Sequence, residues 1–165
     1  MKYIFYSSIF ILFAFAPPSP GRKANKTIYD TLFAEGDIIQ IPTIPFYTCT
    51  NYGEINIDTK DSLNIVADFL LKYPELTVEI ASHADLRGSV EYTNRLSKER
   101  ARACANYLIK ERNIDKNRII PKGYGEFQPI IIEKEILKAK TAREREALYE
   151  QNKRIVLIVI KVNKL

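Results

Sequence analysis

Residues 79–100 read EIASHADLRGSVEYTNRLSKER, and this stretch decides the fold. Alternating apolar residues predict a short strand, Gly88 closes a polar turn, and Ser89 is of the type that caps a following helix. The turn carries Asp85, and the helix carries Arg100. An acid and a base at a strand-to-helix junction can together receive a zwitterion, so the residues favour a binding protein over a catalyst.

The apolar periodicity on either side of this stretch predicts a helix, a strand and a second helix. The first helix starts at Asp58 or Thr59 and stops before Pro74, because the first two are good N-caps and proline ends a helix. Its expected buried stripe is Leu63, Val66, Ala67, Leu70 and Leu71. The strand covers 76–81, and the second helix runs from Ser89 to about Arg112, with Asn113 in the left-handed conformation after it.

Arg100 lies in an apolar row of the second helix, between Leu96 and Cys104. Burying an unpaired guanidinium is costly. Arg100 therefore needs an anionic partner, which the protein or a ligand could supply.

The remaining chain predicts one more strand, a surface helix and a central last strand. The strand covers 119–124, and the charged segment 133–151 has no glycine or proline and is expected to form a single surface helix. The last strand, RIVLIVIKV at 154–162, is apolar on both faces, which is typical of a central strand that is covered, or nearly covered, on both sides.

The N-terminal part divides into three segments. Residues 1–16 have a lysine followed by an apolar run, as in a secretory signal peptide or a short anchor; no cysteine ends the run, which argues against a lipid anchor. Residues 17–43 read as a linker and leading strand, because prolines and scattered charges dominate their first part. The domain proper is expected at 44–163, with its first core strand between Pro45 and Thr50.

Composition narrows the function classes. The 165 residues are 46% apolar and 27% charged, and the net charge of +5 is spread over the chain rather than gathered in a basic stripe, which argues against nucleic-acid binding. One histidine and two distant cysteines do not supply the ligands of a structural metal site, and nothing indicates a cofactor. Cys49 and Cys104 could form a disulfide in an oxidising compartment or remain a free pair.

The motifs SHADLRG, LSKERA, RIIPKGYGEFQP and NKRIV occur in this order, and the chain resembles the OmpA-like C-terminal domain family over about residues 44–162. The resemblance implies an α/β (α+β) fold: a mixed four-stranded sheet with a βαβαβ-type core and helices packed on it. It also implies that Asp85 and Arg100 hold the free end of diaminopimelate in a peptidoglycan stem peptide.

The same resemblance implies the rest of the site. Asn51 aligns loosely with a polar residue lining the pocket, and backbone amides from Leu86 through Arg87 to Gly88 are expected to bind the ligand carboxylate. The supporting residues are His83, Thr93, which stands where the family has asparagine, and Arg154.

The function that follows is noncatalytic binding of peptidoglycan in the periplasm, tethering the outer membrane or an envelope complex to the cell wall. The alternative is a protein-interaction subunit of a secretion or motility machine that uses the same fold. A simpler interpretation of Asp85 and Arg100 is an internal salt bridge. A hydrolase is disfavoured because the chain has one histidine and no evident nucleophile beside a base.

Overall fold

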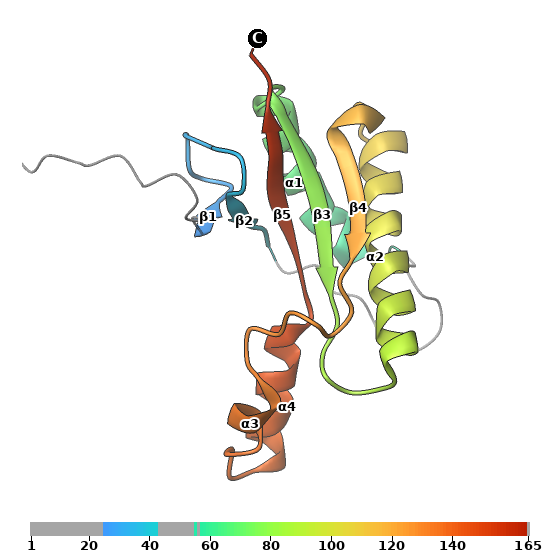
Figure 1. Cartoon of the computed structure of the whole chain (residues 1–165). Helices are drawn as coiled ribbons and strands as arrows, with labels where there is room; N and C mark the ends of the chain where they lie inside the picture. The colour runs from blue at the N-terminus through green and yellow to red at the C-terminus, as the bar shows by residue number, and fades with distance from the viewer. Residues whose placement is uncertain (1–24, 43–54, 56, 165) are drawn as a thin grey trace, which may run out of the picture.

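The structure is a computed structural model that describes residues 25–42, 55 and 57–164 (Figure 1). A mixed sheet forms its centre, two long helices cover one face, and a pair of shorter helices lies beyond one end of the sheet. The strands are β1 (Asn25–Thr27), β2 (Ile38–Gln40), β3 (Leu76–His83), β4 (Ile119–Gly123) and β5 (Arg154–Val162). The helices are α1 (Ile57–Lys72), α2 (Val90–Lys110), α3 (Glu133–Ile136) and α4 (Ala142–Asn152), with a 3₁₀ turn at Lys116–Arg118.

The sheet has the strand order β1-β2-β5-β3-β4. β5 runs antiparallel to both β2 and β3, whereas β3 and β4 are parallel and are joined through α2. The expected mixed α/β class is confirmed, but the sheet has five strands instead of four. Two of the five strands, β1 and β2, lie in residues 17–43, the segment predicted as a linker and leading strand; each has three residues, which are too few to give a readable alternation. The strand expected between Pro45 and Thr50 lies outside the described residues.

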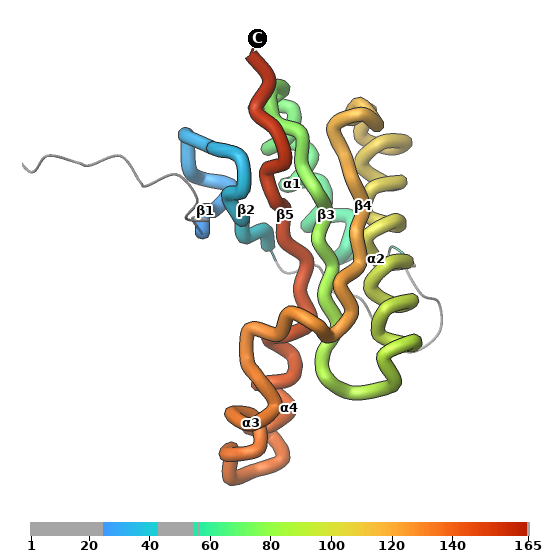
Figure 2. The backbone as a smooth tube through the Cα atoms, in the orientation of Figure 1, coloured from blue at the N-terminus to red at the C-terminus, as the bar shows by residue number. Residues whose placement is uncertain are grey.

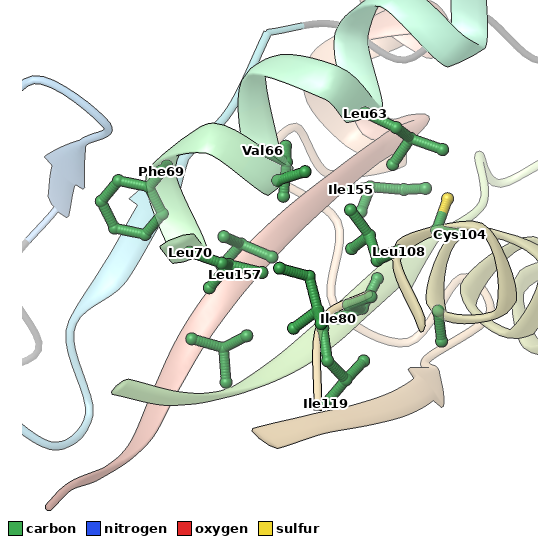
Figure 3. Close-up of a cluster of buried hydrophobic side chains, with 14 of the residues drawn as sticks. Leu63, Val66, Phe69, Leu70, Ile80, Cys104, Leu108, Ile119, Ile155 and Leu157 are labelled. Atoms are coloured by element: carbon green, nitrogen blue, oxygen red, sulfur yellow. The ribbon is translucent and has the colours of Figure 1, made fainter. Parts of the chain in front are cut away.

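The hydrophobic core lies between the sheet and the two long helices (Figure 3). Leu70 from α1, Leu108 from α2 and Leu157 from β5 are each at most 1% exposed. Fully burying side chains of this size contributes about 1.5–3 kcal/mol each, so this layer fixes α2 against the sheet.

The two long helices lie where the sequence predicts, although α1 begins at Ile57, so that Asp58 and Thr59 lie within its first turn. Ser89 caps α2 by accepting a hydrogen bond from the Tyr92 amide, and Asn113 has the expected positive φ of 55° after the helix. One residue of the predicted α1 stripe is wrong, because Leu71 is 53% exposed. Phe69 is buried instead, since Phe33 from the β1–β2 loop packs edge-on against its ring.

The single surface helix predicted for residues 133–151 is wrong: the segment forms α3 and α4, separated by a turn (Figure 2). Thr141 starts α4 with a capping box, in which its hydroxyl accepts from the Glu144 amide and the Glu144 carboxylate accepts from the Thr141 amide. These reciprocal bonds satisfy donors that a continuous helix would use internally, so a new helix starts at this point.

β5 is the middle strand, as expected from its apolar sequence. Its core face is buried, while on the other face Val156 is buried and Ile160 is 41% exposed. Coverage of that second face is therefore partial. None of the helices formed by the described residues is long and apolar enough to span a bilayer.

Candidate ligand-binding site

Three chain segments meet at one edge of the sheet. β3 and β4 are parallel, so their carboxyl ends lie together there, and the antiparallel β5 begins at the same edge, with Arg154 paired to His83. The segment after β3 carries Asp85, and the α3–α4 pair enters β5 beside it (Figure 1). Loops at the carboxyl ends of parallel strands commonly hold ligands, which makes this edge the candidate site.

Asp85 is only 6% exposed and accepts several hydrogen bonds. Its Oδ1 accepts from the Arg87 backbone amide at 3.1 Å, and its Oδ2 accepts from Arg87 Nε at 2.9 Å and from Nη2 at 2.5 Å. Lys153 Nζ lies 3.5 Å from the same Oδ2. The three hydrogen bonds and the nearby Lys153 ammonium fix the orientation of this buried carboxylate.

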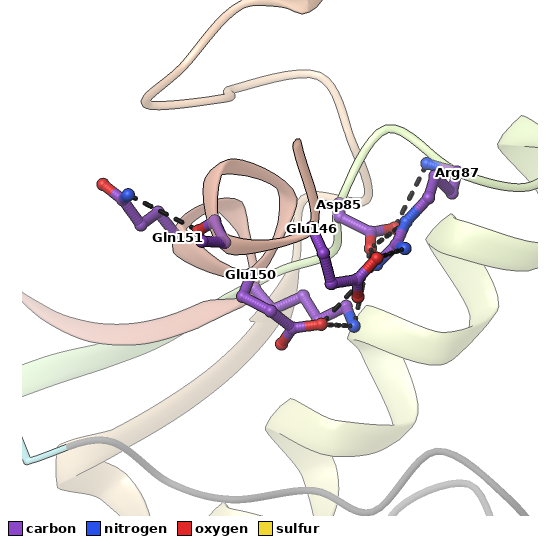
Figure 4. Close-up of polar contacts among 7 residues, drawn as sticks. Asp85, Arg87, Glu146, Glu150 and Gln151 are labelled. Carbon is purple, nitrogen blue, oxygen red and sulfur yellow. Dashed lines mark hydrogen bonds and ion pairs between the residues drawn. The ribbon is translucent and has the colours of Figure 1, made fainter. Parts of the chain in front are cut away.

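Arg87 joins the loop after β3 to α4 (Figure 4). Its Nη1 donates to Glu146 at 2.6 Å, its Nη2 lies 3.5 Å from Glu150, and its guanidinium is 4.7 Å from the centre of the Tyr149 ring. Burial acts to lower the pKa of Arg87, but hydrogen bonds to Asp85 and Glu146 outweigh it and raise that pKa. A guanidinium shared between carboxylates on two segments fixes the loop relative to the helix.

Arg100 is 5% exposed on the face of α2 that packs on the sheet. Burial lowers the pKa of Arg100, because the low-polarity surroundings disfavour its charge. Electrostatic interactions with Tyr92, Asp85 and Glu150 act in the opposite direction and raise the pKa, so the guanidinium lies within electrostatic reach of both carboxylates. The structure thus brings the predicted acid and base to one place.

The turn that carries Asp85 is held on both sides. Gly88 has a φ of +119°, which favours glycine, and Ser89 then caps α2. The Arg87 amide, expected to face a ligand carboxylate, donates to Asp85 instead. Leu86 is half-buried, and Gly88 is exposed.

Thr93 and Ser97 brace the opposite side of the junction. Thr93 is buried, and the single hydrogen of its hydroxyl is shared between two acceptors at 3.2 Å, the Val90 carbonyl and the Glu126 carboxylate. Ser97, which sequence reasoning missed, accepts from the Gly125 amide at 2.9 Å, and the Gly125 carbonyl in turn accepts from the Ala84 amide at 2.8 Å. Threonine at position 93 therefore provides its own brace between α2 and the loop after β4.

His83 is a packed residue beside the site. It is 3% exposed, and its ring stacks on Tyr124 with centroids 5.0 Å apart and an interplanar angle of 8°. Burial, aided by the positive charge of Arg154, lowers the pKa of His83 to about 4. His83 is therefore neutral at physiological pH, which suits a supporting role.

Arg154 and Asn152 hold the entry into β5. Arg154 donates to the carbonyls of Gln128 and Asn152, and burial lowers its pKa. Asn152 is fully buried; its Oδ1 accepts from the amides of Ile130 and Ile131, and its Nδ2 donates to the Ile131 carbonyl. These bonds tie the C-terminal end of α4 and the start of β5 to residues 128–131, the segment that leads into α3, and so help to position α4.

Comparison with known proteins identifies the family. The profile of the OmpA family matches residues 50–143, which is more than half of the chain. The chain belongs to the OmpA family. A curated relative, the peptidoglycan-associated lipoprotein of Rhizobium meliloti (strain 1021), is 31% identical over 110 residues, which cover 67% of this chain and 56% of that protein. The chain thus spans about half the length of this OmpA family relative.

Solved structures of OmpA-like proteins share the fold. The peptidoglycan-associated lipoprotein from Burkholderia pseudomallei aligns with a TM-score of 0.55 and 21% identity, covering 70% of this chain and 87% of that one. The periplasmic domain of Helicobacter pylori MotB aligns with a TM-score of 0.59 and 19% identity, covering 79% and 86%. At these identities the likeness establishes the OmpA-like fold.

The OmpA family motifs pointed to the strand-to-helix side of this candidate site, but not to the side formed by α4. Asn51 lies outside the described residues. Sequence reasoning missed the part that α4 plays: Glu146, Tyr149 and Glu150 lie around the side chain of Arg87, and Lys153, just after the helix, lies beside Asp85 and Glu150. The spacing of Glu146 and Glu150 by four residues, on one face of a helix, was the available signal.

No metal centre is formed by the part of the chain that the structure describes, where no three potential ligands cluster. Cys104 in that part is a free, buried thiol, and burial raises its pKa to about 12. Its thiol is therefore an unreactive core group.

Proposed function

We propose that this protein binds peptidoglycan without catalysis, holding the free diaminopimelate end of a stem peptide between Asp85 and Arg100. Binding takes place in the periplasm and tethers the outer membrane, or a complex of the envelope, to the cell wall. The names of the OmpA family relatives support this proposal, since the curated relative and one structural neighbour are both peptidoglycan-associated lipoproteins.

One observation carries the proposal: an acidic and a basic side chain, 6% and 5% exposed, lie within electrostatic reach of each other at the edge of the sheet. The free end of diaminopimelate carries an ammonium and a carboxylate on one carbon. The ammonium would donate to Asp85, and the carboxylate would accept the two-pronged guanidinium of Arg100. Charge-assisted hydrogen bonds of this kind contribute about 1.5–3 kcal/mol each.

The pair also supplies selectivity between stem peptides. A stem that ends in lysine offers the ammonium but no carboxylate. With such a stem, buried Arg100 would make no bond to the ligand. A site that hydrogen-bonds a polar group of its ligand discriminates strongly against a ligand that lacks that group. We expect walls of the diaminopimelate type to be bound in preference to walls of the lysine type.

The test is co-sedimentation of the purified protein with cell-wall sacculi of each type. The variants are Asp85→Ala and Arg100→Ala, with folding checked by circular dichroism. Arg102→Ala is the matched control, because Arg102 is an exposed arginine of the same helix whose ion pair is with Glu99. We expect the parent and Arg102→Ala to sediment with diaminopimelate sacculi and both site variants to stay in solution.

Two results would contradict the proposal. If folded Asp85→Ala and Arg100→Ala sediment as well as the parent, the pair serves only the fold. If the parent itself stays in solution with both wall types, the protein-interaction role in an envelope machine becomes the better explanation.

A further inference from the structure

The carboxylate that the proposed ligand needs is already occupied within the protein. Asp85 Oδ2 accepts two hydrogen bonds from the Arg87 side chain, at 2.9 and 2.5 Å, and has Lys153 at 3.5 Å. Asp85 Oδ1 accepts the Arg87 amide. An incoming ammonium must therefore compete with a guanidinium for the same oxygen.

Arg87 has a second place to bind. Its Nη1 already donates to Glu146 at 2.6 Å, Glu150 lies 3.5 Å from its Nη2, and the Tyr149 ring supports its flat face. The Arg87 side chain is 40% exposed, so it can turn away from Asp85 without leaving a buried space. Two carboxylates on α4 would keep the displaced guanidinium paired (Figure 4).

We propose that Arg87 is an internal competitor that sets the affinity of the site: the ligand ammonium displaces it from Asp85, and Glu146 and Glu150 of α4 hold it while the ligand is bound. This inference rests on the proposed function. It gives α4 a part in binding, although that helix contributes no group to the ligand itself.

Arg87 and Arg100 then have separable effects. Every ligand that binds Asp85 through an ammonium must displace Arg87. The competition therefore lowers the affinity for all such ligands by one common factor, which is the fraction of molecules in which Arg87 is not bound to Asp85. Arg100 pairs the carboxylate, which only the diaminopimelate end supplies. Arg87 therefore sets how tightly the site binds, whereas Arg100 sets which stem it selects.

The experiment is titration calorimetry of the full chain with two soluble stem peptides, one ending in diaminopimelate and one in lysine. Arg87→Ala should bind both more tightly, by about tenfold, because the guanidinium then no longer competes with the ligand ammonium for Asp85. The ratio of the two affinities should stay at the parent's value. Arg102→Ala serves again as the control arginine and should leave both affinities unchanged.

Two additional measurements separate competition from a structural role. In the Asp85→Ala background, adding Arg87→Ala should produce no gain, because the contested carboxylate is absent. Arg87→Ala should also lower the thermal midpoint of unfolding, since it removes the ties to α4. If Arg87 had only a structural role, Arg87→Ala would lower the stability without making ligand binding tighter.

Unchanged or weaker binding by Arg87→Ala would overturn the inference, and weaker binding for the diaminopimelate stem alone would make Arg87 a direct contact of the ligand carboxylate. The proposed function can stand even if the prediction for Arg87→Ala fails. It stands if the parent binds the diaminopimelate peptide and both Asp85→Ala and Arg100→Ala do not. If neither the parent nor Arg87→Ala binds either peptide, the proposed function fails and the inference with it.

Discussion

Acid should destabilise the protein through His83, and the size of the effect follows from its burial. His83 has a pKa of about 4 in the folded protein against about 6.5 in the unfolded chain. Between these two values the unfolded chain binds a proton that the folded protein does not, so stability rises with pH across this window. Lowering the pH from about 7 to below 4 should therefore remove about 3 kcal/mol through this residue alone.

The assay compares urea unfolding of the parent and His83→Phe at a series of pH values. Phenylalanine keeps an aromatic ring against Tyr124, and Nδ1 of His83 has no hydrogen-bond partner to lose. Carboxylates also titrate at acid pH, but they are common to both proteins and cancel in the difference. The parent should lose about 3 kcal/mol more than the variant between pH 7 and pH 4.

His83 is the single histidine of the chain, so its imidazole resonance in an NMR titration can be assigned without ambiguity. A midpoint near the unperturbed value of about 6.5 would show that the imidazole is hydrated and would refute the burial argument. If the parent and His83→Phe lost the same free energy of unfolding at acid pH, the link between the lowered pKa of His83 and stability would be refuted, even if the titration midpoint were low.

Three further substitutions test how the site edge is built, each by urea unfolding. Gly123→Ala should cost about 3 kcal/mol, because its Cβ would lie 2.4 Å from the Lys98 backbone nitrogen and push α2 away from β4; a loss below about 1 kcal/mol would mean that the helix moves freely. Asn152→Ala should cost about 2–3 kcal/mol, because it leaves the amides of Ile130 and Ile131 without their acceptor, and an unchanged midpoint would show that water replaces the side chain. Thr141→Ala should cost about 1 kcal/mol and reduce helix content by circular dichroism, and unchanged helix content would contradict the capping role.

The long elements could be predicted because several local signals agree at their ends. For α2, Ser89 is a good N-cap, the apolar row has helical spacing, and Asn113 tolerates the left-handed conformation that ends the segment. For β5, nine residues with apolar side chains on both faces are typical of a central strand, and its place in the middle of the sheet confirms the pattern.

Shorter elements could not be predicted because tertiary contacts determine them. β1 has three residues and is fixed by pairing with β2. Phe69 is buried in place of Leu71 because a loop from β1 brings Phe33 onto that side of α1, a contact across 36 positions that periodicity within the helix cannot indicate. The break before α4 is different, since Thr141 and Glu144 form a capping box that a closer reading of the sequence would have found.

The site shows the same division between local and distant information. The family motifs identify Asp85 and Arg100 because these residues lie on one strand-to-helix unit, whose geometry the local sequence determines. Arg87 also lies on that unit, but its partners Glu146 and Glu150 are 59 and 63 positions away, and only the packing of α4 at the edge of the sheet brings them together. A motif can therefore name the groups that a ligand would contact without indicating what already occupies them. Under the proposed function the affinity would depend on both, since the ligand would gain only the difference between its own bonds to Asp85 and those that Arg87 makes in its absence.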